Sequence, residues 1–135
     1  MKTLVVAANR PCKPMLFLSM GMPTVFVIAR DWALRAGVRA ELREQGIHAL
    51  GMDSLDQSGQ AIAAGEMPAA VVLEAVAEIV GDPAAKSLIE RVPTVLIASR
   101  TQTLPLPAAT VLYRPVRVGE IVRSVQQLLR RGQAV

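Results

Sequence analysis

Short apolar runs alternate along the chain with segments in which apolar residues recur at helical spacing. The runs are rich in β-branched residues and are bounded by Gly, Pro or charged residues, as strands are. They predict five strands, at residues 24–29, 47–50, 69–73, 94–98 and 110–113. The run at 69–73 is apolar throughout, which is typical of a central strand covered on both faces of a parallel sheet.

The segments between the strands carry the start and stop signals of helices. They predict helices at residues 31–46, 54–64, 82–91 and 118–131. Asp31 can cap the first helix and Gly46 can end it. In the last helix the apolar side chains fall on one side and the arginines on the other. Strands that alternate with helices in this way predict one doubly wound α/β domain.

Two regions do not follow this alternation. The connection at 99–109 carries Pro105 and Pro107, so it is too short and too rich in proline for a full crossover helix. We expect an extended link or a single turn there. Residues 1–22 precede the first strand and form an N-terminal extension to a domain at 23–135. Three interpretations of the extension remain open: a stretch along a sheet edge, a disordered leader, or a start assigned upstream of the true one.

The composition limits the class of protein. The 135 residues suit one domain with its own core. Although 52% of the residues are hydrophobic, no run approaches the ~20 apolar residues of a membrane span, and the apolar start is shorter than a signal-peptide core. We therefore expect a cytoplasmic protein. The single cysteine, Cys12, has neither a disulfide partner nor metal-ligand neighbours at the usual spacing, which argues against redox and zinc sites.

The charge raises the question of a nucleic-acid partner. The net charge of +4 and the pI near 10.0 come mainly from arginine. However, the arginines are spread along the chain and often stand beside glutamate, as on a solvated helix face. Aromatic residues make up only 3% of the chain, too few for base-stacking surfaces. A nucleic-acid partner is therefore not favoured.

Ligands of an open parallel sheet bind at the carboxyl ends of its strands, so the residues there indicate the function. They are Ala29, Arg30, Asp31, Glu74, Ala98, Ser99, Arg100, Arg114 and Pro115. Trp32 follows directly and lies near the mouth of this predicted pocket, where we expect it to pack and not to act in function.

The order and content of these elements resemble the receiver domain of two-component response regulators. Four segments carry the resemblance: the helix opening ARDWALRAGVRAELREQG, the strands PAAVVLE and VPTVLIASR, and the terminal LYRPVRVGEIVRSVQQLLRRG. It covers residues 23–131, and the 44 residues from Arg30 to Glu74 fit the family. The resemblance implies a flavodoxin-like (CheY-like) α/β fold with a doubly wound parallel five-stranded sheet, strand order 2-1-3-4-5, and here a shortened fourth crossover helix.

In that family, an acidic pair after the first strand and an aspartate after the third hold Mg²⁺, and that aspartate accepts phosphate. By resemblance the acidic pair falls on Ala29 and Arg30, and the phospho-acceptor falls on Glu74. Mg²⁺ prefers closely placed carboxylates. The oxygens of Asp31 are expected to accept hydrogen bonds from the first backbone amides of a helix instead. We therefore expect no metal, no cofactor, no Mg²⁺-dependent phosphorylation and no enzymatic activity.

The remaining pocket positions also depart from the family pattern. The hydroxyl residue that ends the fourth strand falls on Ala98, with Ser99 one place late, and the lysine after the fifth strand falls on Arg114. A carboxylate at the end of a buried strand needs a partner. By resemblance to the family, Arg114 with its planar guanidinium is the best placed for Glu74, and Arg30 is second. The alternative is that Glu74 faces solvent and pairs with no side chain.

The changed pocket on an intact scaffold implies an atypical receiver-like module, a pseudo-receiver of bacterial signal transduction that acts by protein–protein contact. Its partner would be a histidine kinase, an output domain or another signalling protein, and a homodimer is a further option. Two alternatives stay open: a phospho-accepting receiver of a phosphorelay, and an anion-binding flavodoxin-like module.

Overall fold

The computed structural model describes residues 22–101, 108 and 110–133, and in them the chain forms a parallel five-stranded sheet between two layers of helices. Its strands are β2 (Thr24–Ile28), β3 (His48–Met52), β4 (Ala70–Glu74), β5 (Thr94–Ala98) and β6 (Thr110–Tyr113). They lie in the order β3-β2-β4-β5-β6, with every neighbouring pair parallel. Numbered along the chain from β2, this is the predicted order 2-1-3-4-5, so the predicted fold is confirmed.

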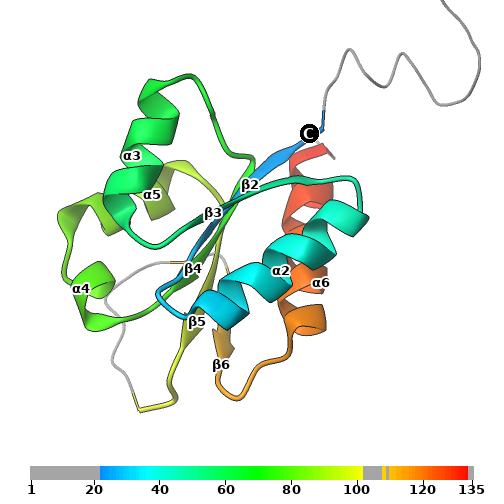
Figure 1. Cartoon of the computed structure of the whole chain (residues 1–135). Helices are drawn as coiled ribbons and strands as arrows, with labels where there is room; N and C mark the ends of the chain where they lie inside the picture. Colours follow the sequence, from blue (N-terminus) through cyan, green and yellow to red (C-terminus); the bar gives the residue numbers. More distant parts are fainter. Residues whose placement is uncertain (1–21, 102–107, 109, 134–135) are drawn as a thin grey trace, which may run out of the picture.

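The helices divide between the two faces of the sheet (Figure 1). One face carries α2 (Trp32–Glu44) and α6 (Val118–Gln133), which contact each other. The other face carries α3 (Leu55–Ala63), α4 (Ala77–Val80) and α5 (Pro83–Arg91). Because a strand points alternate side chains to opposite faces, β2 sends Val25 and Val27 toward α2 and α6, and Phe26 and Ile28 toward the other layer. The two apolar clusters explain why the strands are apolar on both sides.

The predicted helix signals act as expected. The Asp31 carboxylate accepts hydrogen bonds from the backbone amides of Ala33 and Leu34, at 3.0 and 3.2 Å, and so caps α2. Gly46 and Gly65 follow α2 and α3 in the left-handed region, with φ of +79° and +99°. The Asp31 cap thus starts α2 directly after the end of β2, and the two glycines follow the ends of α2 and α3.

Some boundaries differ from the prediction. The second strand starts and ends later than expected, and β4 includes Glu74, which the sequence had placed just after the strand. The parallel register continues through the pair Glu74–Ile97, because the carboxylate finds partners at the sheet end and the strand need not stop before it. The helix α4 was not predicted, since four residues are too few to show a helical period. The last helix continues to Gln133.

Two predictions fall outside the described residues. The N-terminal extension lies in residues 1–21, apart from Met22, and the centre of the shortened fourth crossover lies in 102–107 and 109. The strands that this crossover joins, β5 and β6, pair in parallel from Val95–Thr110 to Ala98–Tyr113. In the described part of the chain, no helix combines the length and apolar character required to cross a bilayer.

Candidate functional site

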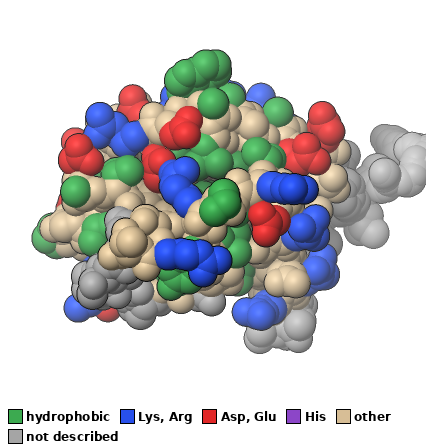
Figure 2. All heavy atoms as spheres, turned by 90° about the horizontal axis from the view of Figure 1, so that it is seen from below, with side chains coloured by type: hydrophobic (Ala, Val, Ile, Leu, Met, Phe, Trp, Pro, Cys, Tyr) green, Lys and Arg blue, Asp and Glu red, His purple; other side chains and the backbone are tan. Residues whose placement is uncertain are grey.

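The carboxyl ends of the strands come together at one end of the molecule, the lower end in Figure 1 and the face turned to the viewer in Figure 2. The sequence-predicted pocket residues therefore lie at the same end. Glu74 is the buried one among the charged residues there: only 5% of its surface is exposed, and the whole of β4 that precedes it is buried. A carboxylate in that position must be compensated by donors.

Three donors satisfy the Glu74 carboxylate. One guanidinium nitrogen of Arg114 donates to Oε2 in a close ion pair. The backbone amides of Arg30 and Asp31 donate to Oε1, at 2.7 and 3.2 Å. The predicted Glu74–Arg114 pair is thus present, and the alternative of a solvent-facing Glu74 is wrong. Because the Arg114 side chain is 42% exposed while that of Glu74 is 7% exposed, the cation keeps contact with water and the carboxylate does not.

The backbone fixes Arg114 in place. Its amide donates to the carbonyl of Ala98, at 2.8 Å, so the residue after β6 is tied to the last residue of β5. Its peptide bond to Pro115 is cis. The side chain then reaches across the end of β5 to the end of β4. The Glu74–Arg114 pair therefore joins strands that are separated by one strand in the sheet.

The second predicted partner, Arg30, behaves differently. Its backbone amide contacts Glu74, but its guanidinium lies 3.3 Å from the carboxylate of Glu78 in α4. The prediction that the Arg30 side chain is an alternative partner of Glu74 is wrong. Its guanidinium pairs instead with the exposed carboxylate of Glu78 on α4. Glu78 was missed by sequence reasoning, since α4 itself carried no periodic signal.

The residues at the end of β2 do not fit a magnesium ion. Ala29 has no side-chain oxygen, and its backbone carbonyl accepts a hydrogen bond from the Arg35 guanidinium at 2.6 Å. One oxygen of Asp31, Oδ1, accepts both capping hydrogen bonds of α2, so this side chain offers at most its other oxygen. Both oxygens of Glu74 accept from nitrogen donors. Mg²⁺ needs several oxygen ligands in near-octahedral geometry, and this donor set consists of carboxylates that cationic or amide groups already hold. Across the residues that the structure describes, no three His, Cys, Asp or Glu side chains group as metal ligands.

The end of β5 lacks a hydroxyl that points to Glu74 from within the strand. Ala98, which takes that position, is buried, and its carbonyl accepts from the Arg114 amide. Ser99 follows the strand, and its hydroxyl lies 2.9 Å from that of Thr101, whose amide also donates to it at 3.3 Å. These contacts of Ser99 stabilise the turn after β5.

Beside this site lies a cleft that the sequence did not predict. It is lined by Arg30, Asp53, Ser54, Leu55, Asp56, Glu78, Ile79 and Asp82. These residues belong to three segments, which follow β2, β3 and β4 and are far apart in the sequence. No single sequence motif therefore indicates the cleft.

Trp32 is also not as expected. It is 71% exposed, so the expectation that it packs is wrong. Its place as the first residue of α2 turns its side chain away from the sheet while the Asp31 cap holds the helix start.

The comparisons with known proteins bear on the fold. A receiver protein from Burkholderia phymatum superposes with a TM-score of 0.62 and 24% identity, over 79% of this chain and 94% of that one. The receiver domain of a Francisella response regulator superposes with a TM-score of 0.68 and 18% identity, over 82% of this chain and 98% of that one. A CheY-like receiver domain from Methanospirillum hungatei JF-1 superposes with a TM-score of 0.68 and 14% identity, over 84% of this chain and 98% of that one. No family model matches the sequence, and neither does any curated protein. The chain therefore has the fold of response regulator receiver domains.

Proposed function

We propose that this chain is a receiver-like module that acts in bacterial signal transduction through protein–protein contact, without Mg²⁺-dependent phosphoryl transfer. The fold supports the first half of the proposal, because it is the fold of receiver domains. The occupied carboxylate of Glu74 supports the second half and carries the proposal.

A phospho-accepting carboxylate must present one oxygen to the phosphorus atom, and the transferred group needs positive charge to neutralise it. In this chain Oε2 of Glu74 accepts from Arg114, and Oε1 accepts from two backbone amides. An attacking oxygen would first have to leave these donors. The metal that would neutralise the phosphoryl group has no set of free carboxylates at the ends of β2 and β4.

The same contacts suggest a module with one constant state. The Glu74–Arg114 pair links the ends of β4 and β6, and the Arg30 and Asp31 amides bring in the start of α2. A charge-assisted pair is stronger than a neutral hydrogen bond. Three elements are thus held together without a covalent modification, so a partner would meet the same surface at all times.

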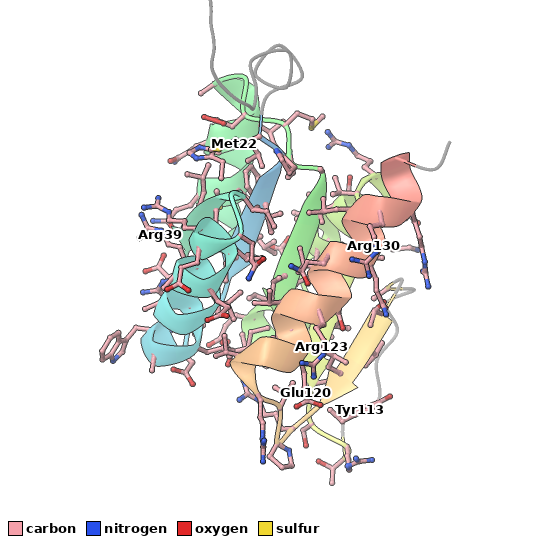
Figure 3. All side chains as sticks on the ribbon, turned by 90° about the vertical axis from the view of Figure 1, so that its right-hand side faces the viewer. Met22, Arg39, Tyr113, Glu120, Arg123 and Arg130 are labelled. Carbon is pink, nitrogen blue, oxygen red and sulfur yellow. The ribbon has the colours of Figure 1, made fainter. Side chains whose placement is uncertain are left out.

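By resemblance to receivers, the partner would bind α6, β6 and the β5–β6 connection. The exposed side of α6 carries Arg123, Arg130 and Arg131, and Figure 3 shows Arg123 and Arg130 extending outward from this helix. A histidine kinase, an output domain or another signalling protein with an acidic surface fits this face by charge.

Labelling with a small phosphodonor tests the proposal. The purified chain is incubated with radiolabelled acetyl phosphate and Mg²⁺, beside an active receiver domain as the positive control. The expected result is no base-labile acyl-phosphate label on this chain, because both oxygens of Glu74 already accept hydrogen bonds and the strand ends offer no set of free carboxylates for Mg²⁺. Mass spectrometry would locate any label, and Mg²⁺-dependent label on Glu74 or Asp31 would establish the phosphorelay alternative instead.

A phosphate titration addresses the anion-binding alternative. Arg114, the arginine at the centre of the site, already faces the carboxylate of Glu74. We therefore expect no saturable rise of the melting temperature with inorganic phosphate or sulfate. A saturable rise would require an anion site that binds the folded state.

A further inference from the structure

Charge is divided unequally over the end of the molecule where the strands terminate. Above β3, β2 and β4, the cleft is lined by four carboxylates and one guanidinium. The carboxylates belong to Asp53, Asp56, Glu78 and Asp82. The guanidinium, that of Arg30, lies against Glu78. This half of the face, here called the acidic half, therefore has an excess of negative charge.

The opposite half, above β5 and β6, carries arginines. Arg100 stacks over the ring of Tyr113, with 5.6 Å from its guanidinium carbon to the ring centroid. Arg114 follows β6 and is paired with Glu74. The exposed Arg117 stands before α6, and its amide donates to the carboxylate of the exposed Glu120 at 2.8 Å. With Glu74 and Glu120 counted against the three arginines, this half keeps a net positive charge of one. We call it the basic half. In Figure 2, Asp and Glu side chains lie at the upper left and also at the right, and Lys and Arg side chains lie at the centre, below it and among the acidic ones.

Trp32 adds an apolar group to the same end of the molecule. It is the only tryptophan of the chain, and 71% of its surface is exposed. It stands at the start of α2, directly after Arg30 and Asp31, on the side of β2 and thus beside the acidic half. Guanidinium groups bind carboxylates through paired hydrogen bonds and also stack on indole rings. The acidic half and Trp32 therefore offer the two kinds of partner that arginine prefers.

We infer that this face binds a second copy of the same chain, with the acidic half and Trp32 of each copy against the basic half of the other. Neither half carries the inference by itself. Together they count, because one surface holds both the arginines and their preferred partners, separated along the strand order β3-β2-β4-β5-β6. A two-fold axis makes such a surface self-complementary, because the same patch then contacts itself in opposite order.

The charge pattern also selects the axis. If two copies meet face to face about an axis that crosses the strand order, β3 of one copy lies opposite β6 of the other, and opposite charges meet. If the axis runs along the strand order, β3 lies opposite β3 and like charges meet, which is unfavourable. Five strands about 4.8 Å apart with a helix layer of about 10 Å on each side give a face of roughly 20 by 30 Å. That size is comparable to the ~800 Å² per partner of a standard interface.

Other occupants fit the whole face less well. A nucleic acid or another extended polyanion would be attracted by Arg100 and Arg117 but repelled by the four carboxylates beside them. A uniformly basic partner would be attracted by the carboxylates but repelled by the arginines above β5 and β6. The inference does not rest on the proposed signalling function, since the charges would bring two copies together whether or not the chain meets a kinase.

The test is a charge-swap experiment on the full chain. Sedimentation velocity and the emission of Trp32 are followed from about 1 μM to about 1 mM protein. We expect a reversible dimer, and a shift in Trp32 emission with the same concentration dependence. Raising NaCl from 0.1 to 1 M shortens the Debye length from about 10 to about 3 Å, so the dissociation constant should rise at least tenfold.

Two variants then probe the two halves. The variant with Asp53→Lys and Asp56→Lys gives each copy two basic halves, and the variant with Arg100→Glu and Arg117→Glu gives it two acidic halves. Each variant alone should be a monomer under conditions in which the original chain is a dimer. Mixed in equal amounts they should form a heterodimer, because every half again meets its opposite.

A matched control changes the same kind of charge elsewhere. Arg130→Glu with Arg131→Glu alters the far end of α6, away from Glu120 and the strand ends (Figure 3), and should leave the dissociation constant within about twofold. Circular dichroism verifies that each variant is folded. A chain that stays monomeric at 1 mM overturns the inference. So does a dimer that both charge-swap variants retain, or a mixture of the two variants that remains monomeric.

Discussion

Glu74 satisfies three donors with two oxygen atoms, so the effect of replacing it depends on which donors the replacement leaves unpaired. Glu74→Ala removes the acceptor of the Arg30 and Asp31 amides and of the Arg114 guanidinium. We expect a loss of about 1–3 kcal/mol in the free energy of unfolding. This is less than the ~3–5 kcal/mol of breaking a fully buried ion pair, because Arg114 is 42% exposed and can turn to water. Urea unfolding of the original chain and of the variant measures this difference in the free energy of unfolding.

Two matched variants separate the parts of this effect. Glu74→Gln keeps one acceptor oxygen for the two amides but removes the charge and the acceptor of Arg114, so it should cost less than the alanine variant, which removes all three contacts. Arg30→Ala removes an exposed contact with Glu78 and should change the stability by no more than about 0.5 kcal/mol. If Glu74→Ala were as neutral as Arg30→Ala, the carboxylate would have no structural role and the constant-state module would lose its basis.

The contacts of individual residues were predictable only where the topology determined them. The Glu74–Arg114 pair joins the ends of two strands that lie close in the sheet, and the resemblance to receiver domains implied that strand order. The side chain of Arg30 could not be placed in the same way. Its partner Glu78 lies on a helix of four residues, and so short an element leaves no pattern of apolar positions. The cleft of four carboxylates was missed because its lining residues follow three different strands.

At the scale of elements, the start and stop signals of the helices were the reliable part of the sequence. Asp31, Ser54 and Asp82 each cap a helix, and Gly46 and Gly65 each follow one with positive φ. These residues act through local backbone geometry, which the sequence determines over a few positions. Strand ends were less accurate, because the register with a neighbouring strand decides where a strand ends, and that register is not local.

Two glycines allow this local effect to be measured. Gly46 has φ of +79° after α2, whereas Gly59 lies within α3, and a Cβ atom added to either meets no atom within 4 Å. The effect of alanine is therefore conformational at both positions. Gly46→Ala should cost about 1–2 kcal/mol, while Gly59→Ala should stabilise the protein by about 0.5–1 kcal/mol. Thermal unfolding of both variants checks this, and effects of equal sign would contradict it.

At the scale of the whole molecule, the fold class could be predicted because it depends on the alternation of many residues and not on any one of them, and the resemblance to receiver domains implied the strand order. The surface could not. The exposed Trp32, the acidic half and the basic half arise from side chains distant in the sequence that the sheet order collects at one end. Periodicity predicts which side chains are buried, and it says little about how exposed charges from different loops combine.

The sheet also decides whether the molecule unfolds in one step. Leu96 and Ile97 are neighbours in β5, both essentially unexposed, and they point into the two different clusters on the two faces of the sheet. Truncating either to alanine should cost about 2–5 kcal/mol, through lost burial and the cavity that remains.

Because β2, β4 and β5 supply side chains to both clusters, neither cluster is independent of the shared sheet. We therefore expect each variant to unfold in a single transition at a lower urea concentration. Circular dichroism, which reports all helices, should coincide with Trp32 emission, which reports the start of α2. If Leu96→Ala separated the two curves, α3, α4 and α5 would unfold while α2 and α6 still held the sheet. The contacts shared through the strands would then be too weak to couple the two layers.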